Sequence, residues 1–183
     1  METSKHEKGN YLKFFMMIGT SMIAMFFLMY LHSYEILNHA WFSETRLFMT
    51  MIMGGAMIII MLAFMLNMYK NKNANISILA GGLLLIIASI WLVRSQTTVS
   101  GTDYMEGMIP HHSIAILTSE RASERANIED KRVRKLADEI IAAQLREIKE
   151  MEWLIEDIKN NGIAETAEEA NSRPVPNFEG SLN

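Results

Sequence analysis

Two adjacent histidines follow a methionine and a proline in the polar half of this chain, in the string Met108-Ile109-Pro110-His111-His112. Thioether sulfur suits Cu(I), and imidazole nitrogen suits either copper oxidation state. The chain has no cysteine, so disulfides and thiolate metal sites are excluded and soft-metal chemistry must use methionine and histidine. The string therefore predicts a copper-type ligand set.

Helical spacing adds candidate ligands to this string. Residues three, four or seven apart share one helix face. The aligned candidates are Met105, Met108 and His112 on one helix and Gln144, Glu147 and Met151 on the next. Facing stripes of this kind could surround an ion with nitrogen, sulfur and oxygen donors. His111 lies about 100° round the helix from His112, and we expect the two imidazoles to be the principal ligands.

The same residues also suit a site that binds no metal. A histidine on an apolar face is often a hydrogen-bonded core residue, and methionine fills gaps between helices. Metal binding would require neutral imidazoles, so the affinity should fall below a pH of about 6.5, the unperturbed histidine pKa. Spacing alone leaves the metal site and the packed core as alternatives.

Three long apolar runs precede the histidine string, at about residues 14–31, 47–68 and 76–93. Each has roughly 18 to 22 residues, enough to cross a hydrocarbon core of about 30 Å. None contains an internal Asp, Glu, Lys or Arg, which argues against a buried ionisable pathway. We therefore expect residues 1–94 to be a membrane anchor with three transmembrane helices.

Basic residues set the expected orientation of the anchor. They lie before the first run and between the second and third, at Lys5, Lys8, Lys13, Lys70 and Lys72. The positive-inside rule then places the amino terminus in the cytoplasm and the polar half in the periplasm or outside the cell, with the anchor in a bacterial inner membrane. The net charge of −4 and the lack of a basic block exclude nucleic acid as an expected partner.

The polar half is expected to contain a linker, a helical hairpin and a tail. Residues 95–102 suit a linker, and helical periodicity predicts an antiparallel hairpin over residues 103–161. Residues 162–183 are polar and acidic, which favours a flexible tail. Two helices bury too little to be expected to stand alone, so we expect two copies to form a four-helix bundle.

Local signals mark the expected helix ends in the hairpin. Thr102 or Asp103 could cap the first helix, and Asn127 could cap the second. Pro110 predicts a kink or a helix start immediately before the histidine pair, because proline lacks a backbone donor. Gly162, after two asparagines, supplies the expected stop.

A second candidate metal site lies between the first two apolar runs. His32, Glu35 and His39 have the spacing of one helix face and lie on the expected outer side. The alternative is a set of interfacial polar residues beside an aromatic belt.

Methionine and glycine patterns mark the apolar runs themselves. Methionines recur every four residues in the second run, at Met49, Met53, Met57, Met61 and Met65. They could pass Cu(I) across the bilayer, but the simpler interpretation is helix packing. The pairs Gly54-Gly55 and Gly81-Gly82 predict close contacts between helices.

The hairpin resembles the bacterial family called domain of unknown function 305. The matching residues are Asp103-Tyr104-Met105-Glu106-Gly107-Met108-Ile109-Pro110-His111-His112, Ala115-Ile116, Val133-Arg134, Leu136-Ala137, Ile140-Ile141, Gln144, Glu147-Ile148, Met151 and Trp153-Leu154. The resemblance implies a ferritin-like, α-helical, exported or membrane-attached domain, in a family that includes copper-binding, copper-tolerance proteins of the CopM kind. It also implies that the metal-associated positions are His111, His112, Met108, Met105 and Met151. Many members have a Met-Ala pair where this chain has Leu117-Thr118, so one thioether of the family pattern is absent.

The sequence as a whole predicts an all-α protein with three transmembrane helices and an extracytoplasmic ferritin-like half bundle completed by dimerisation. The expected function is to bind Cu(I) or Cu(II) for buffering, tolerance or transfer, without catalysis. The expected protein partner is a copper donor or a copper acceptor. One alternative is a structural or interaction module that dimerises through the hairpin. A weaker one is a ferritin-like metal oxidase, disfavoured because the Glu-x-x-His spacing of such sites does not occur around the histidine pair.

Overall fold

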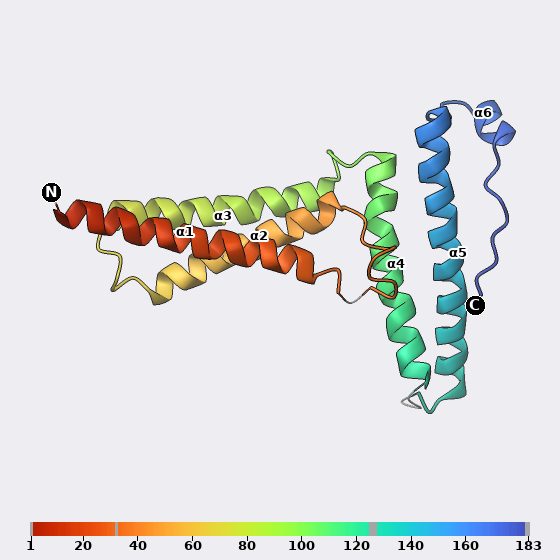
Figure 1. Ribbon diagram of the computed structural model, residues 1–183, viewed down its shortest axis with the longest axis horizontal. Helices are drawn as coiled ribbons and strands as arrows, with labels where there is room; N and C mark the ends of the chain where they lie inside the picture. The colour runs from red at the N-terminus through yellow and green to blue at the C-terminus, as the bar shows by residue number, and fades with distance from the viewer. Residues whose placement is uncertain (1, 32, 125–127, 182–183) are drawn as a thin grey trace. The chain divides into compact units, whose positions relative to one another are not determined.

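The computed structural model describes residues 2–31, 33–124 and 128–181, with side chains from residue 10 onward, and this part of the chain is helical without strands. The helices are α1 (Glu2–Leu28), α2 (Glu44–Phe64), α3 (Lys72–Ser95), α4 (Gly101–Glu124), α5 (Lys131–Asn161) and α6 (Ala167–Ser172) (Figure 1). The chain divides into two compact units, Met1–Met29 with Glu44–Thr98 and Tyr30–Ser43 with Val99–Asn183. The predicted all-α class is confirmed.

The first unit consists of three helices long and apolar enough to span a membrane. The candidate spans are Asn10–Leu28, Glu44–Phe64 and Lys72–Ser95, and they are compatible with a membrane protein. The second run was predicted to continue to residue 68, but α2 ends at Phe64 and a turn follows, with Met68 N–H donating to the Met65 carbonyl. Apolar composition identifies a span, but it does not show where the backbone stops being helical.

Two glycines bring α2 and α3 into close contact. A Cβ atom on Gly55 would lie 2.8 Å from the Gly82 carbonyl oxygen and 2.7 Å from a side-chain carbon of Ile86. Gly54 instead meets the side chain of Met22 on α1, and Gly81 has nothing within 4 Å of its Cβ position. Gly55 and Gly82 therefore let the two backbones approach each other, as small residues do in membrane helix pairs.

An aromatic and amide network fixes the turn between α2 and α3. Tyr69 is buried with Phe14 in a small apolar cluster. Asn75 Nδ2 donates to the Tyr69 carbonyl at 2.8 Å, and its Oδ1 accepts from the Tyr11 hydroxyl at 2.7 Å. Asn71 caps α3, its side chain accepting from the Ala74 N–H at 3.1 Å. Contacts from α1, the turn and α3 thus hold this end of the first unit together.

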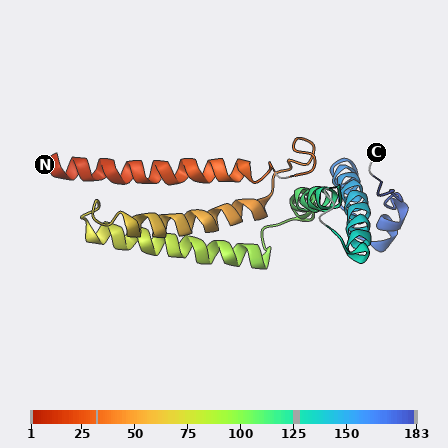
Figure 2. The ribbon, with the colours of Figure 1, turned by 90° about the horizontal axis from the view of Figure 1, so that it is seen from below.

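In the second unit, α4 and α5 lie side by side and run in opposite directions (Figures 1 and 2). Apolar residues at helical spacing form the core between them, since one stripe from each helix is removed from water. The buried members are Met105, Ile109, Ile116, Ile141, Ile148 and Ile155. α4 continues through Pro110, so the proline neither starts nor ends the helix.

The helix ends of this unit differ from the predicted caps. Ser100, not Thr102 or Asp103, precedes α4: its hydroxyl accepts from the Asp103 N–H at 3.2 Å, and the Asp103 carboxylate accepts from the Ser100 N–H at 3.1 Å. This reciprocal pair satisfies two donors at the helix start. Asp130 caps α5, and the predicted cap Asn127 lies outside the described residues. The predicted stop at Gly162, which has φ 80°, is confirmed.

The connection Tyr30–Ser43 packs onto the second unit, which the sequence analysis did not anticipate. Tyr34 and Trp41 lie against the apolar core of α4 and α5. The Tyr34 backbone N–H donates to Ser113 Oγ at 2.7 Å. This segment therefore covers part of the core that two helices alone would leave exposed.

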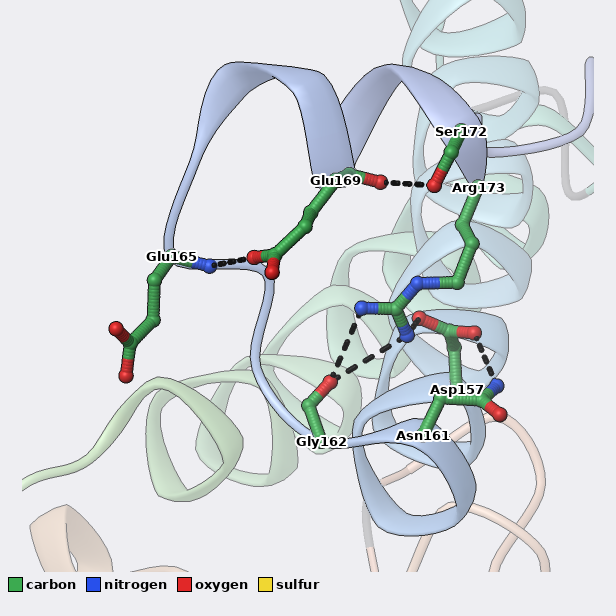
Figure 3. Close-up of polar contacts among 7 residues, drawn as sticks. All are labelled: Asp157, Asn161, Gly162, Glu165, Glu169, Ser172 and Arg173. Carbon is green, nitrogen blue, oxygen red and sulfur yellow. Dashed lines mark hydrogen bonds and ion pairs between the residues drawn. The ribbon is translucent and has the colours of Figure 1, made fainter.

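The tail also packs, although its composition predicted flexibility over residues 162–183. Its described part contains α6, where Thr166 and Glu169 form a capping box. Arg173 Nη1 lies 2.6 Å from the Asp157 carboxylate and also donates to the Gly162 carbonyl (Figure 3). Lys149 donates to the Glu179 carbonyl at 3.0 Å. These few specific contacts hold an acidic segment along α5, and no periodic pattern in the sequence announces them.

We expect Gly55→Ala to destabilise the full chain by about 1–3 kcal/mol, because its new methyl group overlaps the α3 backbone. The matched control is Gly81→Ala, whose methyl group enters open space and should leave stability unchanged or slightly raised. Thermal unfolding in detergent measures both variants. Equal loss of stability in both would contradict the close α2–α3 contact.

We expect Arg173→Ala to free the tail, because Arg173 joins the end of α5 to the segment after α6. Limited digestion with a glutamate-specific protease should then cut faster at Glu165, Glu168 and Glu179. Arg132→Ala is the control, since Arg132 is 91% exposed and paired only at the start of α5. Unchanged cleavage kinetics would show that Arg173 does not hold the tail.

Candidate metal centre

His112 is buried between α4 and α5, and both of its ring nitrogens have partners. Nδ1 lies 2.9 Å from the Met108 carbonyl oxygen of the preceding helical turn. Nε2 lies 2.8 Å from Glu147 Oε2 on α5. The carboxylate that faces His112 therefore comes from the stripe that the sequence analysis proposed.

These contacts fix where the protons of the pair must be. A carbonyl oxygen only accepts, so Nδ1 carries a hydrogen and donates to Met108. The contact between Nε2 and Glu147 then needs a second proton, because a bare imidazole nitrogen and an ionised carboxylate are both acceptors. His112 and Glu147 thus share one proton at a place where a cation would satisfy the same two electron pairs.

His111 does not join this buried pair. It is exposed, its ring centroid is 6.4 Å from that of His112, and the ring planes are inclined by 66°. Neighbouring positions on a helix diverge by about 100°, which accounts for the difference in burial. In the part of the chain that the structure describes, no three His, Cys, Asp or Glu residues are close enough to hold a metal ion together.

The methionines and Gln144 lie on or near the same interface. Met105 is buried in the core, and Met151 packs against it from α5. Met108 and Gln144 are half-buried. Arg146 Nη2 lies 3.8 Å from the second oxygen of Glu147 and contributes positive charge beside the carboxylate. The structure thus unites His112 with Glu147 and places two thioether side chains in the adjoining core.

The two described residues of the second candidate site, Glu35 and His39, have different partners. His32 lies outside the described residues. Residues 33–39 form bends and turns rather than a regular helix. Glu35 is exposed and accepts from the Asn38 amide at 2.6 Å, whereas His39 is buried with Nδ1 2.8 Å from Ser113 Oγ. Burial lowers the pKa of His39 and so favours its neutral form, although the nearby Glu35 charge opposes this shift.

Ser113 is a structural residue that sequence reasoning missed. Its side chain is completely buried, accepts the Tyr34 N–H and contacts His39. These bonds attach the Tyr30–Ser43 connection to α4 one residue after His112. The one available signal was a small polar residue directly after the histidine pair, and it does not reveal a partner more than seventy positions away in the sequence.

Burial raises the pKa of two groups near the Tyr30–Ser43 connection. Burial raises the pKa of Glu152 on α5, and the charge of Glu35 raises it further. Burial likewise raises the pKa of the Tyr34 hydroxyl, which lies 3.4 Å from the Glu120 carboxylate. Glu35 and Glu152 therefore repel each other where the connection meets α5.

Comparison with protein families identifies the region that contains the pair. Residues 101–180 match the family model described as "Domain of unknown function (DUF305)". The match begins at the first residue of α4 and ends at Gly180, where a Cβ atom would overlap the Ala142 backbone of α5. The matched region therefore includes the packed tail, beyond the hairpin itself.

The chain is also similar to a curated protein, "Uncharacterized protein L153" of Acanthamoeba polyphaga mimivirus. The two are 37% identical over 75 residues, which is 41% of this chain and 48% of the relative. The chain thus matches about half the length of that relative. No solved structure matches. Residues 101–180 resemble the DUF305 family, and the three apolar helices α1 to α3 lie outside the match.

Proposed function

We propose that this protein is a membrane-anchored metal-binding protein that holds copper and buffers it or passes it to a partner protein. The observation that carries the proposal is the 2.8 Å contact between His112 Nε2 and Glu147 Oε2, which needs a proton between two acceptor atoms. A metal ion can replace such a proton once the side chains separate, because each ligand bond to a metal needs about 2.0–2.2 Å. The family resemblance supports the same region as the functional one.

The proposed ligands combine hard and soft donors. His112 and Glu147 supply nitrogen and oxygen, which suit Cu(II), and thioether sulfur suits Cu(I). Met108, Met105 and Met151 are the sulfur candidates, with Gln144 as a supporting amide. Two facing donors do not complete a copper coordination shell, so these methionines or a second copy's His111 must provide the remainder.

The exposed position of His111 suits an exchange role. A ligand at the surface can take an ion from a donor protein or give it to an acceptor, whereas the buried His112 retains it. The three apolar helices would keep this unit at a membrane. The lysines near the start of α1 and in the α2–α3 turn favour a cytoplasmic amino terminus and an extracytoplasmic second unit.

We expect the full chain to bind Cu(I) and Cu(II), and His112→Ala and Glu147→Gln each to weaken binding by about tenfold or more. Competition with a chromophoric chelator, under reducing and then oxidising conditions, measures both affinities. His111→Ala should mainly slow transfer to a second chelator, because it leaves the buried pair intact.

Glu150→Gln is the matched control for this experiment. Glu150 lies on the same helix and pairs with Arg146 at 3.4 Å, but it does not contact His112. It should bind copper like the unaltered chain. Copper affinity that survives the double change His111→Ala and His112→Ala would sink the proposal.

A second candidate function is an interaction module without metal. Two observations favour it: His112 already satisfies both nitrogens within the chain, and Val133 and Leu136 on α5 are 49% and 55% exposed. These side chains border an apolar groove of about 200 Å³ between the ends of α4 and α5. A second copy could cover this surface and complete a four-helix bundle.

We expect Leu136→Glu to shift a dimer to monomer if this groove is the contact between two copies, because it buries a charge in the interface. Ile163→Glu is the control, since Ile163 is 66% exposed beyond the end of α5. Sedimentation in detergent measures the mass of each variant. An unaltered chain that is already monomeric at high concentration would rule out this dimer.

A further inference from the structure

A cavity of about 490 Å³ lies at the end of the α2–α3 pair, where the turn joins the two helices. Its walls combine apolar side chains, two lysines and the buried amide of Asn75. The residues that line it include Leu66, Lys70, Lys72, Asn75, Ile76 and Leu79. The copper proposal makes no use of this cavity.

Along α3, the cavity lining changes from a charged residue at the start of the helix to apolar residues further along it. Lys72, Ile76 and Leu79 stand at positions i, i+4 and i+7, so they share one helix face. Leu79 lies about 10 Å further along the helix axis than Lys72, at 1.5 Å per residue. Lys72 begins the candidate span, and the two apolar residues continue into it. A ligand in this cavity meets charge at the membrane boundary and apolar surface below it.

Two positive charges, from Lys70 and Lys72, stand at the mouth of the cavity. Lys70 and Lys72 are exposed, and neither has an ion pair among the described residues. Glu44 is the one acidic side chain described in this unit, and it stands at the opposite end of α2, hydrogen-bonded to Thr98. The two lysines therefore favour an anion at the mouth of the cavity.

The backbone that carries the lysines is fixed before any ligand arrives. Asn75 is 7% exposed and bonds both the Tyr69 carbonyl and the Tyr11 hydroxyl. These bonds hold the turn between the two lysines against α1 and α3. A preformed site binds more tightly than a flexible one, because less conformational entropy is lost when the ligand binds.

We propose that this cavity binds an anionic phospholipid. The phosphate lies between Lys70 and Lys72, and the first part of one acyl chain lies along Ile76 and Leu79. A lysine near a membrane surface attracts an anionic headgroup. Its long apolar stem can follow the helix surface while the ammonium group stays in water. The combination of charge and apolar depth favours a lipid over a free phosphate ion, which would use the charge alone.

The test measures which lipids the full chain retains in mild detergent, by native mass spectrometry. Phosphatidylglycerol and phosphatidylcholine with the same acyl chains are added in equal amounts. We expect preferential retention of phosphatidylglycerol, and about tenfold weaker retention by the double variant Lys70→Gln and Lys72→Gln. The control is Lys131→Gln with Lys159→Gln, which removes the same charge from exposed positions on α5 and should retain the lipid normally.

Two further measurements separate lipid binding from its alternatives. Inorganic phosphate at millimolar concentration should not displace the lipid, and Ile76→Ser should weaken retention with both lysines present. Displacement by phosphate, with no effect of Ile76→Ser, would identify a simple anion site and overturn the proposal. Equal retention of the two lipids by the unaltered chain would also overturn it, and that comparison does not depend on whether any variant folds.

Discussion

The contact between His112 Nε2 and Glu147 Oε2 requires a proton on one of the two atoms, because both are otherwise acceptors. Nδ1 donates its hydrogen to the Met108 carbonyl, so the neutral ring has no hydrogen left for Nε2, which faces the carboxylate. This constraint makes the pair either a neutralised structural contact or a place for a cation. The two proposed functions are the two ways of satisfying it, and the copper proposal requires the proton to be replaceable.

The packing of α4 against α5 determines that His112 and Glu147 face each other. The isoleucine stripes of α4 and α5 set the depth at which the two helices meet, and a shift by one residue would turn Glu147 away from His112. The Tyr30–Ser43 connection covers one side of this core, and the segment after Gly162 follows α5. Segments without helical periodicity thus add the cover that a pair of helices needs.

Periodicity predicted the helices and the facing stripes well, because these depend on local spacing. It paired His112 with the correct region of α5, and it recognised Gly162 as a stop. It could not predict that His111 is exposed, because adjacent positions on a helix diverge and only the packing partner selects one of them. It also missed Ser113, the packed tail and the Ser100 cap, since each depends on a contact between irregular segments. Glu35 and His39 lie in an irregular segment outside the helices, where helical spacing alone does not predict which side chains share a face.

The attachment of Tyr34 and His39 to Ser113 joins two stretches of the second unit that lie far apart in the sequence. This unit is joined to the first by three covalent crossings, before Tyr30, after Ser43 and before Val99. The second unit therefore consists of two separate stretches of the chain, and its core can be completed only after both have been synthesised.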